Sequence, residues 1–238
     1  MKPLWLLVAG WLAAAAIVAA LVVDGRSKAL ERGHRSAEAL AQIVEEHSAR
    51  TFQSVSLALS VVADAWELSQ PPKNDAGFRE LLRERLQDLP YVRALFVIGP
   101  DGFVIHDTDF PRRSGVSLAG RPYFRRYLDD ARLQREVSAP FSSGPGEPSG
   151  WSVAVTERLG RSGEMQGVVV AAVQPAYFEA LYRKLELSEG DVIALFHQDG
   201  SLIARHPPGE EEIGKPFREL PLFSQHLPHG PKIGRAHV

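Results

Sequence analysis

Apolar side chains form a stripe with helical spacing along residues 27–70. No glycine follows Gly33 in this segment, and the next proline is Pro71, so nothing interrupts a helix. The apolar positions recur at steps of three, four or their sums, as on one face of an amphipathic helix: Leu30, Ala37, Leu40, Val44, Phe52, Val55, Leu59, Val62 and Trp66. The pattern predicts one long helix, either packed on its own domain or also forming the seam of a homodimer near residues 30–44.

Four short apolar runs later in the chain predict β-strands, because turn residues bound them: residues 92–98, 103–106, 152–157 and 167–173. A Gly-Pro-Asp-Gly turn at residues 99–102 joins the first two runs, and the connection between the last two contains two glycines. Shorter helices are predicted over residues 78–86 and 175–187. We therefore expect an α+β protein with a curved antiparallel sheet.

A partial internal repeat divides this part of the chain. Four motifs recur further on in the same order: Ala94-Leu95-Phe96 as Ala194-Leu195-Phe196, Asp101-Gly102 as Asp199-Gly200, Ile105 as Ile203, and Gly120-Arg121-Pro122-Tyr123 as Gly214-Lys215-Pro216-Phe217. This order predicts two copies of one module, at residues 71–187 and 188–232. The second copy lacks its last strands, so we expect the natural protein to continue past Val238. Residues 233–238 can be back-translated into a sequencing adapter, and we interpret them as read-through.

The most apolar stretch is residues 4–23, which hold no charge and only Gly10 outside the apolar set. A helix needs ~20 such residues to cross ~30 Å of hydrocarbon. Residues 1–26 are therefore predicted to be a transmembrane anchor with a short cytoplasmic start. The alternative is a signal peptide, whose apolar run is usually shorter, at ~7–15 residues. Basic residues follow the span, and by the positive-inside rule they would place the downstream part in the cytoplasm: Arg26, Lys28, Arg32 and Arg35.

Composition excludes several classes of function. The chain has no cysteine and a net charge of −2, so thiolate metal sites and disulfides are excluded and nothing attracts nucleic acid in bulk. Neighbouring His106 and Asp107 are metal-ligand types, but adjacent strand residues point to opposite faces. No Gly-x-Ser-x-Gly elbow or paired acids in a catalytic context are present. We expect no enzyme activity within these residues, no catalytic residue, no metal and no cofactor.

A cationic and aromatic cluster, Gly120-Arg121-Pro122-Tyr123-Phe124-Arg125, lies between the two strand pairs. This connection must cross the sheet, where a small-molecule pocket would form. The predicted ligand-binding residues are Arg121, Tyr123, Phe124, Arg125 and Trp151. Other interpretations stay open. Arg121 could instead form a surface ion pair with Asp129 or Asp130, and the aromatic rings and Trp151 could serve packing alone.

The apolar span, the long helix and the two modules combine with Arg121-Pro122-Tyr123-Phe124 and a later Ser138-Ala139-Pro140-Phe141. With these motifs the chain resembles a double Cache sensor domain over about residues 30–217. That family is PAS-like and extracytoplasmic in bacterial receptors, and the likeness is closest to sensory regions ahead of diguanylate cyclases or histidine kinases. The resemblance implies tandem PAS-like modules, the second truncated, outside the bacterial cytoplasmic membrane. We follow it on orientation, against the charge count.

The resemblance also implies a type of ligand. The amino-acid-binding version of the family has an arginine, one residue, a tryptophan and a tyrosine here, and Arg121, Tyr123 and Phe124 match these in type. The arginine would hold a carboxylate by two parallel hydrogen bonds, and the aromatic rings would wall the pocket. The aspartate that holds the ammonium of an amino acid is missing, because the corresponding segment, residues 171–174, contains no acid. We therefore expect a small carboxylate or another small anion.

Together these features predict the ligand-sensing region of a membrane-bound signalling receptor. Closure of residues 121–125 on the sheet would shift the long helix, and a homodimer through this stalk would pass the shift to a cytoplasmic cyclase or kinase domain. One alternative is the sensor region of a chemoreceptor. Another is an anchored or secreted binding module without signalling output.

Overall fold

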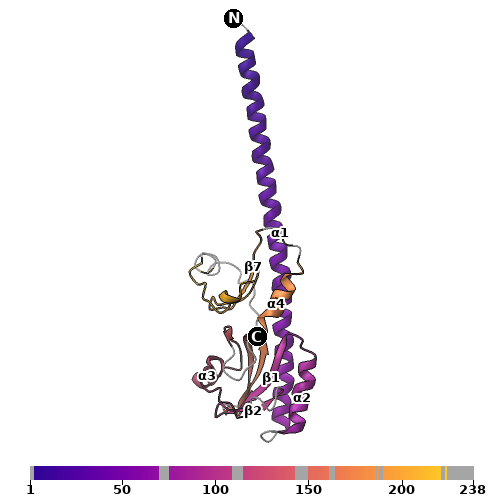
Figure 1. Cartoon of the computed structure of the whole chain (residues 1–238), viewed down its shortest axis with the longest axis vertical. Helices are drawn as coiled ribbons and strands as arrows, with labels where there is room; N and C mark the ends of the chain where they lie inside the picture. The colour runs from indigo at the N-terminus through magenta and orange to yellow at the C-terminus, as the bar shows by residue number, and fades with distance from the viewer. Residues whose placement is uncertain are drawn as a thin grey trace. The chain divides into compact units, whose positions relative to one another are not determined.

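The computed structural model describes residues 3–69, 75–108, 115–142, 150–160, 164–185, 187, 190–220 and 223. The chain divides into two compact units, Met1–Glu46 and His47–Val238. Helix α1 (Pro3–Ser69) supplies the described part of the first unit and begins the second. The prediction of one long helix is confirmed, and it begins well before residue 27 (Figure 1). The predicted read-through at residues 233–238 lies outside the described residues.

Within the described part of the chain, no helix is both long and apolar enough to cross a membrane. The predicted anchor at residues 4–23 is helical, but the side chains of residues 4–10 and 12–16 lie outside the described residues. Further along the first unit, ion pairs one helical turn apart join Asp24 to Lys28 at 2.7 Å and His34 to Glu38 at 3.1 Å. Such exposed pairs contribute only about 0.3–0.5 kcal/mol each.

The second unit contains an antiparallel sheet whose strand order is β2-β1-β6-β5-β3, with β4 also paired to β5. The bounds are β1 (Val92–Ile98), β2 (Val104–Asp107), β3 (Arg135–Val137), β4 (Phe141–Ser142), β5 (Trp151–Leu159) and β6 (Gly167–Val173). The α+β class and all four predicted strands are confirmed. The short strands β3 and β4 were not predicted, because two or three residues carry no periodicity.

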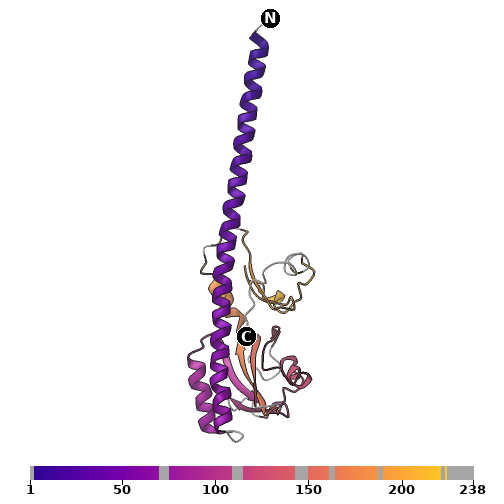
Figure 2. The same cartoon turned by 180° about the vertical axis from the view of Figure 1, so that it is seen from behind.

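Helices cover both faces of this sheet (Figures 1 and 2). On one side α2 (Ala76–Gln87) lies along the last part of α1, and α3 (Pro122–Asp129) lies on the other side. The stripe that predicted the long helix is buried against the sheet and its neighbours: Phe52, Val55, Leu59, Val62 and Trp66. Burial of each such side chain contributes about 1.5–3 kcal/mol. Helix α4 (Pro175–Tyr182) joins this layer, with Phe178 stacked 5.6 Å from Phe52; it is shorter than predicted.

A second antiparallel sheet is formed by β7 (Ile193–Phe196) and β8 (Leu202–His206), followed by a short 3-10 helix, η1 (Glu210–Glu212). Its hairpin repeats the geometry of β1 and β2. Both hairpins have an irregularity one residue before the end of the first strand, between Val97 and Ile98 and between Leu195 and Phe196. The internal repeat is thus present in the fold as well as in the sequence.

The structure corrects one part of that repeat. The backbone N–H groups of Gly115 and Leu118 donate to Val104 and Gly102, and those of Gly214 and Phe217 donate to the matching residues Leu202 and Gly200. Residues 214–217 therefore correspond to residues 115–118, not to residues 120–123 as the sequence match predicted. Gly115 and Gly214 share positive φ angles of 76° and 78°, which favour glycine. The structural equivalence follows this turn geometry, and the shared Pro-aromatic pair is a coincidence of sequence.

Candidate functional site

The predicted cluster forms the beginning of α3. Arg121 is the N-cap, in extended conformation, and Pro122 occupies the first helical turn. Proline suits this place because its fixed φ matches a helix and its missing N–H would have no partner in the first turn. The sequence analysis assigned these residues to a connection. They form a helix because three aromatic rings at helical spacing are buried together on one face.

Those three rings are Tyr123, Phe124 and Tyr127, each at most 2% exposed. They pack on the sheet face formed by alternate residues of β1, β5 and β6, in a core cluster with Ala94, Phe96, Ile98, Ala154, Val168, Val170 and Ala172. Two of the predicted site residues, Tyr123 and Phe124, are thus part of the core. The Tyr123 ring also contacts Phe141, with ring centroids 5.1 Å apart.

Arg121 contacts both residues of β4, Phe141 and Ser142. Its guanidinium carbon lies 5.4 Å from the centroid of the Phe141 ring, and its Nη1 donates to the backbone oxygen of Ser142 at 3.4 Å. This hydrogen bond is at the long limit for the interaction. The fold therefore brings together Arg121, Tyr123 and Phe141, which supplies a cation beside two aromatic rings. Such an arrangement is suited to a small anion with an apolar part.

The two other predicted residues lie elsewhere. Arg125 is exposed on α3. Trp151 opens β5, where side chains alternate between faces, and Ala154 is the β5 residue that packs under α3. Alternation therefore directs Trp151 away from Ala154. Its ring packs instead against Gly214, which follows η1.

Sequence reasoning missed Phe141 and Ser152 as members of the site. They are directly paired across β4 and β5, so their side chains share a face. Ser152 is fully buried, and its Oγ has no hydrogen-bond partner among the described residues. The signal for Ser152 was strand alternation with Ala154. Phe141 belongs to a motif that supported the family resemblance, but alternation could not place its side chain because β4 is two residues long.

Arg158 of β5 holds the other end of α3. Its guanidinium donates to the backbone oxygens of Leu133 at 2.8 Å, Tyr127 at 2.9 Å and Asp130 at 2.8 Å. The last carbonyls of a helix have no partner within it, and here a buried cation supplies one. Beside it, the Tyr127 hydroxyl is 2.9 Å from Thr156 Oγ1, and burial raises the pKa of Tyr127. Arg158 thus fixes the position of α3 on the sheet.

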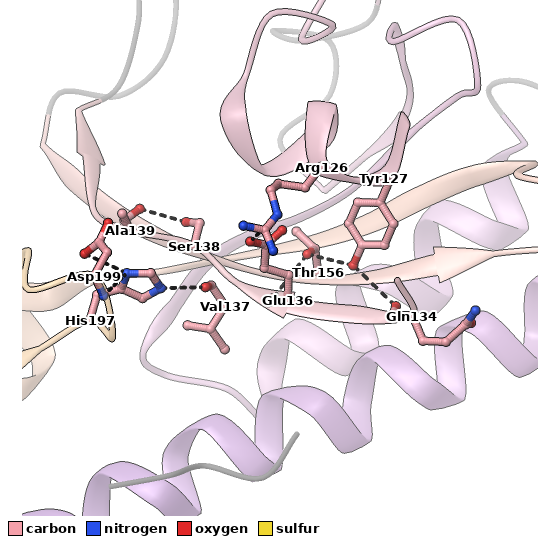
Figure 3. A network of polar contacts seen from close by, with 10 residues as sticks. All are labelled: Arg126, Tyr127, Gln134, Glu136, Val137, Ser138, Ala139, Thr156, His197 and Asp199. Carbon is pink, nitrogen blue, oxygen red and sulfur yellow. Dashed lines mark hydrogen bonds and ion pairs between the residues drawn. The ribbon is translucent and has the colours of Figure 1, made fainter. Parts of the chain in front are cut away.

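A polar network links α3 to the second sheet (Figure 3). Arg126 of α3 pairs with Glu136 of β3 at 3.3 Å. Burial raises the pKa of Glu136, opposed by the charges of Arg126 and His197. His197, just after β7, contacts β3: its Nε2 is 3.0 Å from the backbone oxygen of Val137. The strand that follows α3 is therefore in direct contact with the second module.

The other ring nitrogen of His197 faces an acid. Its Nδ1 lies 2.9 Å from Asp199 Oδ1, and the backbone N–H of Ser201 donates to the same carboxylate at 2.8 Å. Burial would raise the pKa of Asp199, but the hydrogen bonds from His197 and Ser201 outweigh it, and the pKa is lowered. In the described part of the chain no group of three His, Asp or Glu could hold a metal ion.

The contact between Gly214 and Trp151 gives a test of how the second module is seated. A Cβ at Gly214 would lie 2.6 Å from the Trp151 ring, whereas among the described residues nothing lies within 4 Å of one at Gly115. Both glycines have the same positive φ, so an alanine at either costs about 1–2 kcal/mol. We expect Gly214→Ala to lose about 1–3 kcal/mol more than Gly115→Ala in urea unfolding, because of overpacking. Equal losses would contradict this contact.

Two comparisons bear on the family. Residues 175–235 match the family model dCache_1_like, described as a histidine kinase sensor domain. The fold matches the extracellular domain of rpHK1S-Z16, which is described as a histidine kinase, with a TM-score of 0.71 and 27% identity over 81% of this chain and 77% of that one. The chain carries a dCache-like sensor domain. The resemblance found in the sequence is confirmed.

Other solved structures with a similar fold are more distant in sequence. The ligand-binding domain of the Pseudomonas fluorescens chemoreceptor CtaA, solved with L-isoleucine, matches with a TM-score of 0.58 and 14% identity over 75% of this chain and 69% of that one. The corresponding domain of the Pseudomonas aeruginosa PAO1 chemoreceptor PctB, solved with L-Gln, matches with a TM-score of 0.59 and 13% identity over 75% of this chain and 69% of that one. At this identity they show the fold alone. No curated protein matches the dCache-like chain.

Proposed function

We propose that this chain is the extracytoplasmic ligand-sensing region of a bacterial membrane receptor, anchored by residues 4–23. Its ligand is a small carboxylate or another small anion bound at the beginning of α3. The observation that carries the proposal is the placement of the Arg121 guanidinium over Phe141, 3.4 Å from the Ser142 carbonyl and beside the Tyr123 ring. A guanidinium in such a place holds carboxylates by paired, charge-assisted hydrogen bonds.

The ligands of the two distant chemoreceptor structures support a carboxylate as the group that Arg121 binds. Both were solved with an amino acid, and every amino acid carries a carboxylate. At the end of β6, where the resemblance implies an acid for the ammonium, this chain has Ala172 and Gln174 instead. An ammonium buried here would lack a counter-charge from these positions. We therefore propose a small acid without the amino group.

Two matches favour a histidine kinase as the cytoplasmic output of the receptor, since the family model and rpHK1S-Z16 both carry that description. A diguanylate cyclase is the other output that the sequence resemblance implies. The chemoreceptor structures favour the alternative of a chemoreceptor sensor region. A complete reading frame that encodes a kinase, cyclase or methyl-accepting domain would decide between them.

The signal would leave the site through α3 and β3. A ligand that binds Arg121 would shift α3 toward the sheet. This shift would move Glu136 of β3 through its ion pair with Arg126. The next residue, Val137, contacts His197 after β7 and would pass the shift to the second sheet. We also propose that the chain acts as a homodimer through α1, because apolar side chains on this helix are exposed at a spacing close to a heptad: Ile43, Leu57, Val61 and Leu68.

Arg121→Ala is the direct test of the ligand site. We expect it to abolish binding of small carboxylates, measured by calorimetry on the full chain in mild detergent with propionate, lactate and pyruvate as probes. A charge-assisted hydrogen-bond pair is worth about 1.5–3 kcal/mol per bond, so at least a tenfold loss is expected. Arg132→Ala, on the exposed loop after α3, is the matched control. Unchanged affinity in Arg121→Ala would exclude the clamp.

A further inference from the structure

The sheet face under α3 has one row of small side chains. Ala94, Ala172 and Ala154 are in register across β1, β6 and β5, and all three are buried in the core cluster. The next row across the same strands consists of Phe96, Val170 and Thr156, which are larger. A row of small residues alone does not define a site, because neighbouring side chains can fill the space.

Ser152 provides the independent observation. It stands two residues before Ala154, so it faces the same side of the sheet. Its Oγ is completely buried and has no hydrogen-bond partner among the described residues. Buried hydroxyls are nearly always hydrogen-bonded, since an unmade bond costs free energy. A hydroxyl beside the alanine row that has no partner among the described residues therefore points to a polar group that is supplied from outside the protein.

The position of Ser152 relates this hydroxyl to the proposed anion site. Ser152 pairs directly with Phe141 across β4 and β5. The Phe141 ring in turn lies beneath the Arg121 guanidinium and beside Tyr123. A ligand whose carboxylate is held by Arg121 thus has its next atoms directed over Phe141 toward Ser152.

We infer that Ser152 is a specificity-determining residue, which selects acids with an oxygen on the carbon next to the carboxylate: 2-hydroxy and 2-oxo acids. This inference rests on the proposed function. A hydroxyl can donate to an oxo group and exchange a hydrogen bond with a hydroxyl. The row consists of three alanines, and Ser152 beside it is uncharged, so none of these side chains offers an ammonium a counter-charge. A plain alkyl acid would leave the Ser152 hydroxyl unpaired.

The binding test compares three acids of equal carbon number on the full chain in mild detergent. For the wild type we expect lactate or pyruvate to bind about 5–10 times more tightly than propionate, the value of one hydrogen bond. Ser152→Ala should remove this preference and leave propionate affinity unchanged. Equal affinities in the wild type, or a preference that survives Ser152→Ala, would overturn the inference.

A second measurement needs no ligand. Ser152→Ala should raise the thermal midpoint of the free protein, because it removes a buried hydroxyl without a partner. Ser138→Ala is the matched control, since its buried Oγ donates to Ala139 O at 2.8 Å and accepts from Ala154 N–H at 2.9 Å. That substitution should lower the midpoint. A lower midpoint for Ser152→Ala would show that the hydroxyl is already paired and would overturn the inference.

Arg121→Ala separates the two proposals. If it abolishes binding of all three acids while Ser152→Ala keeps the preference, the anion site stands and only the role of Ser152 is lost. If Arg121→Ala leaves all affinities unchanged, the proposed function fails. Absence of binding of all three acids to the wild type would overturn both.

Discussion

Arg158→Ala is expected to lower the free energy of unfolding by about 3 kcal/mol or more. The substitution removes a donor from three backbone oxygens at and after the end of α3, those of Tyr127, Asp130 and Leu133. Among the described residues, only Asp130 O still accepts from another backbone N–H, that of Leu133 at 3.2 Å. It also removes the guanidinium that lies 5.3 Å from the centroid of the Tyr127 ring. Urea unfolding, followed by circular dichroism, measures the loss. If the proposed site at the start of α3 binds the ligand, its affinity should fall as well, because α3 carries Arg121 and Tyr123.

Two variants make this result interpretable. Arg158→Lys keeps the charge but has one ammonium in place of a planar group with several donors, so it should retain only part of the stability. Arg125→Ala removes an exposed arginine from the same helix and should change stability by no more than about 0.5 kcal/mol. A loss of similar size for Arg125→Ala and Arg158→Ala would contradict the role assigned to Arg158.

Acid should destabilise the protein through His106. Burial, and next the charge of Arg79, lower the pKa of His106 from its ordinary 6.5 to about 4. Between these values the unfolded chain binds a proton that the folded chain does not, so stability is lost as the pH falls from 6.5 to about 4 and the loss is complete below that range. At about 1.4 kcal/mol per pKa unit, the shift corresponds to about 3 kcal/mol.

His106→Leu should remove this part of the pH dependence. The ring packs 4.8 Å from Phe78 and 5.9 Å from Trp66, and neither ring nitrogen has a hydrogen-bond partner among the described residues. A leucine therefore loses no hydrogen bond, and the variant should be at least as stable at neutral pH. His34→Gln, whose side chain is 76% exposed, is the control. The measurement is urea unfolding at several pH values from 7.5 to 4, and identical profiles for wild type and His106→Leu would contradict the prediction.

The extent of the prediction from sequence differs between elements. The strands at residues 92–98 and 167–173 were predicted with their observed ends, because central strands buried on both faces are continuous apolar runs bounded by turns. The apolar stripe on α1 was equally clear, since the side chains on the buried face of this helix recur at helical spacing. Helix α3 was not recognised, because eight residues with two arginines resemble a connection until three rings are seen to share one face.

The candidate site shows the same limit. Residue types alone predicted Arg121 and Tyr123 as ligand-binding residues, and strand alternation with Ala154 could have placed Ser152 on the same face of the sheet. Trp151 was placed with them because it opens a neighbouring strand, yet its ring packs on Gly214. Alternation shows that Trp151 and Ser152 lie on opposite faces of β5, but only the packing of Ala154 shows which of these faces carries α3.

The sequence by itself determined the α+β class, the long helix and the central strands, and it predicted residues 121–125 as the ligand-binding cluster. These depend on local periodicity and on residue type. Only the tertiary structure decided that Phe141 lies under Arg121, that the buried Ser152 hydroxyl has no partner among the described residues, that Arg158 fixes the end of α3, and that residues 214–217 repeat residues 115–118. Each of these depends on pairing between distant segments, because the free energy that selects a pairing comes from burial and hydrogen bonds formed across the whole sheet.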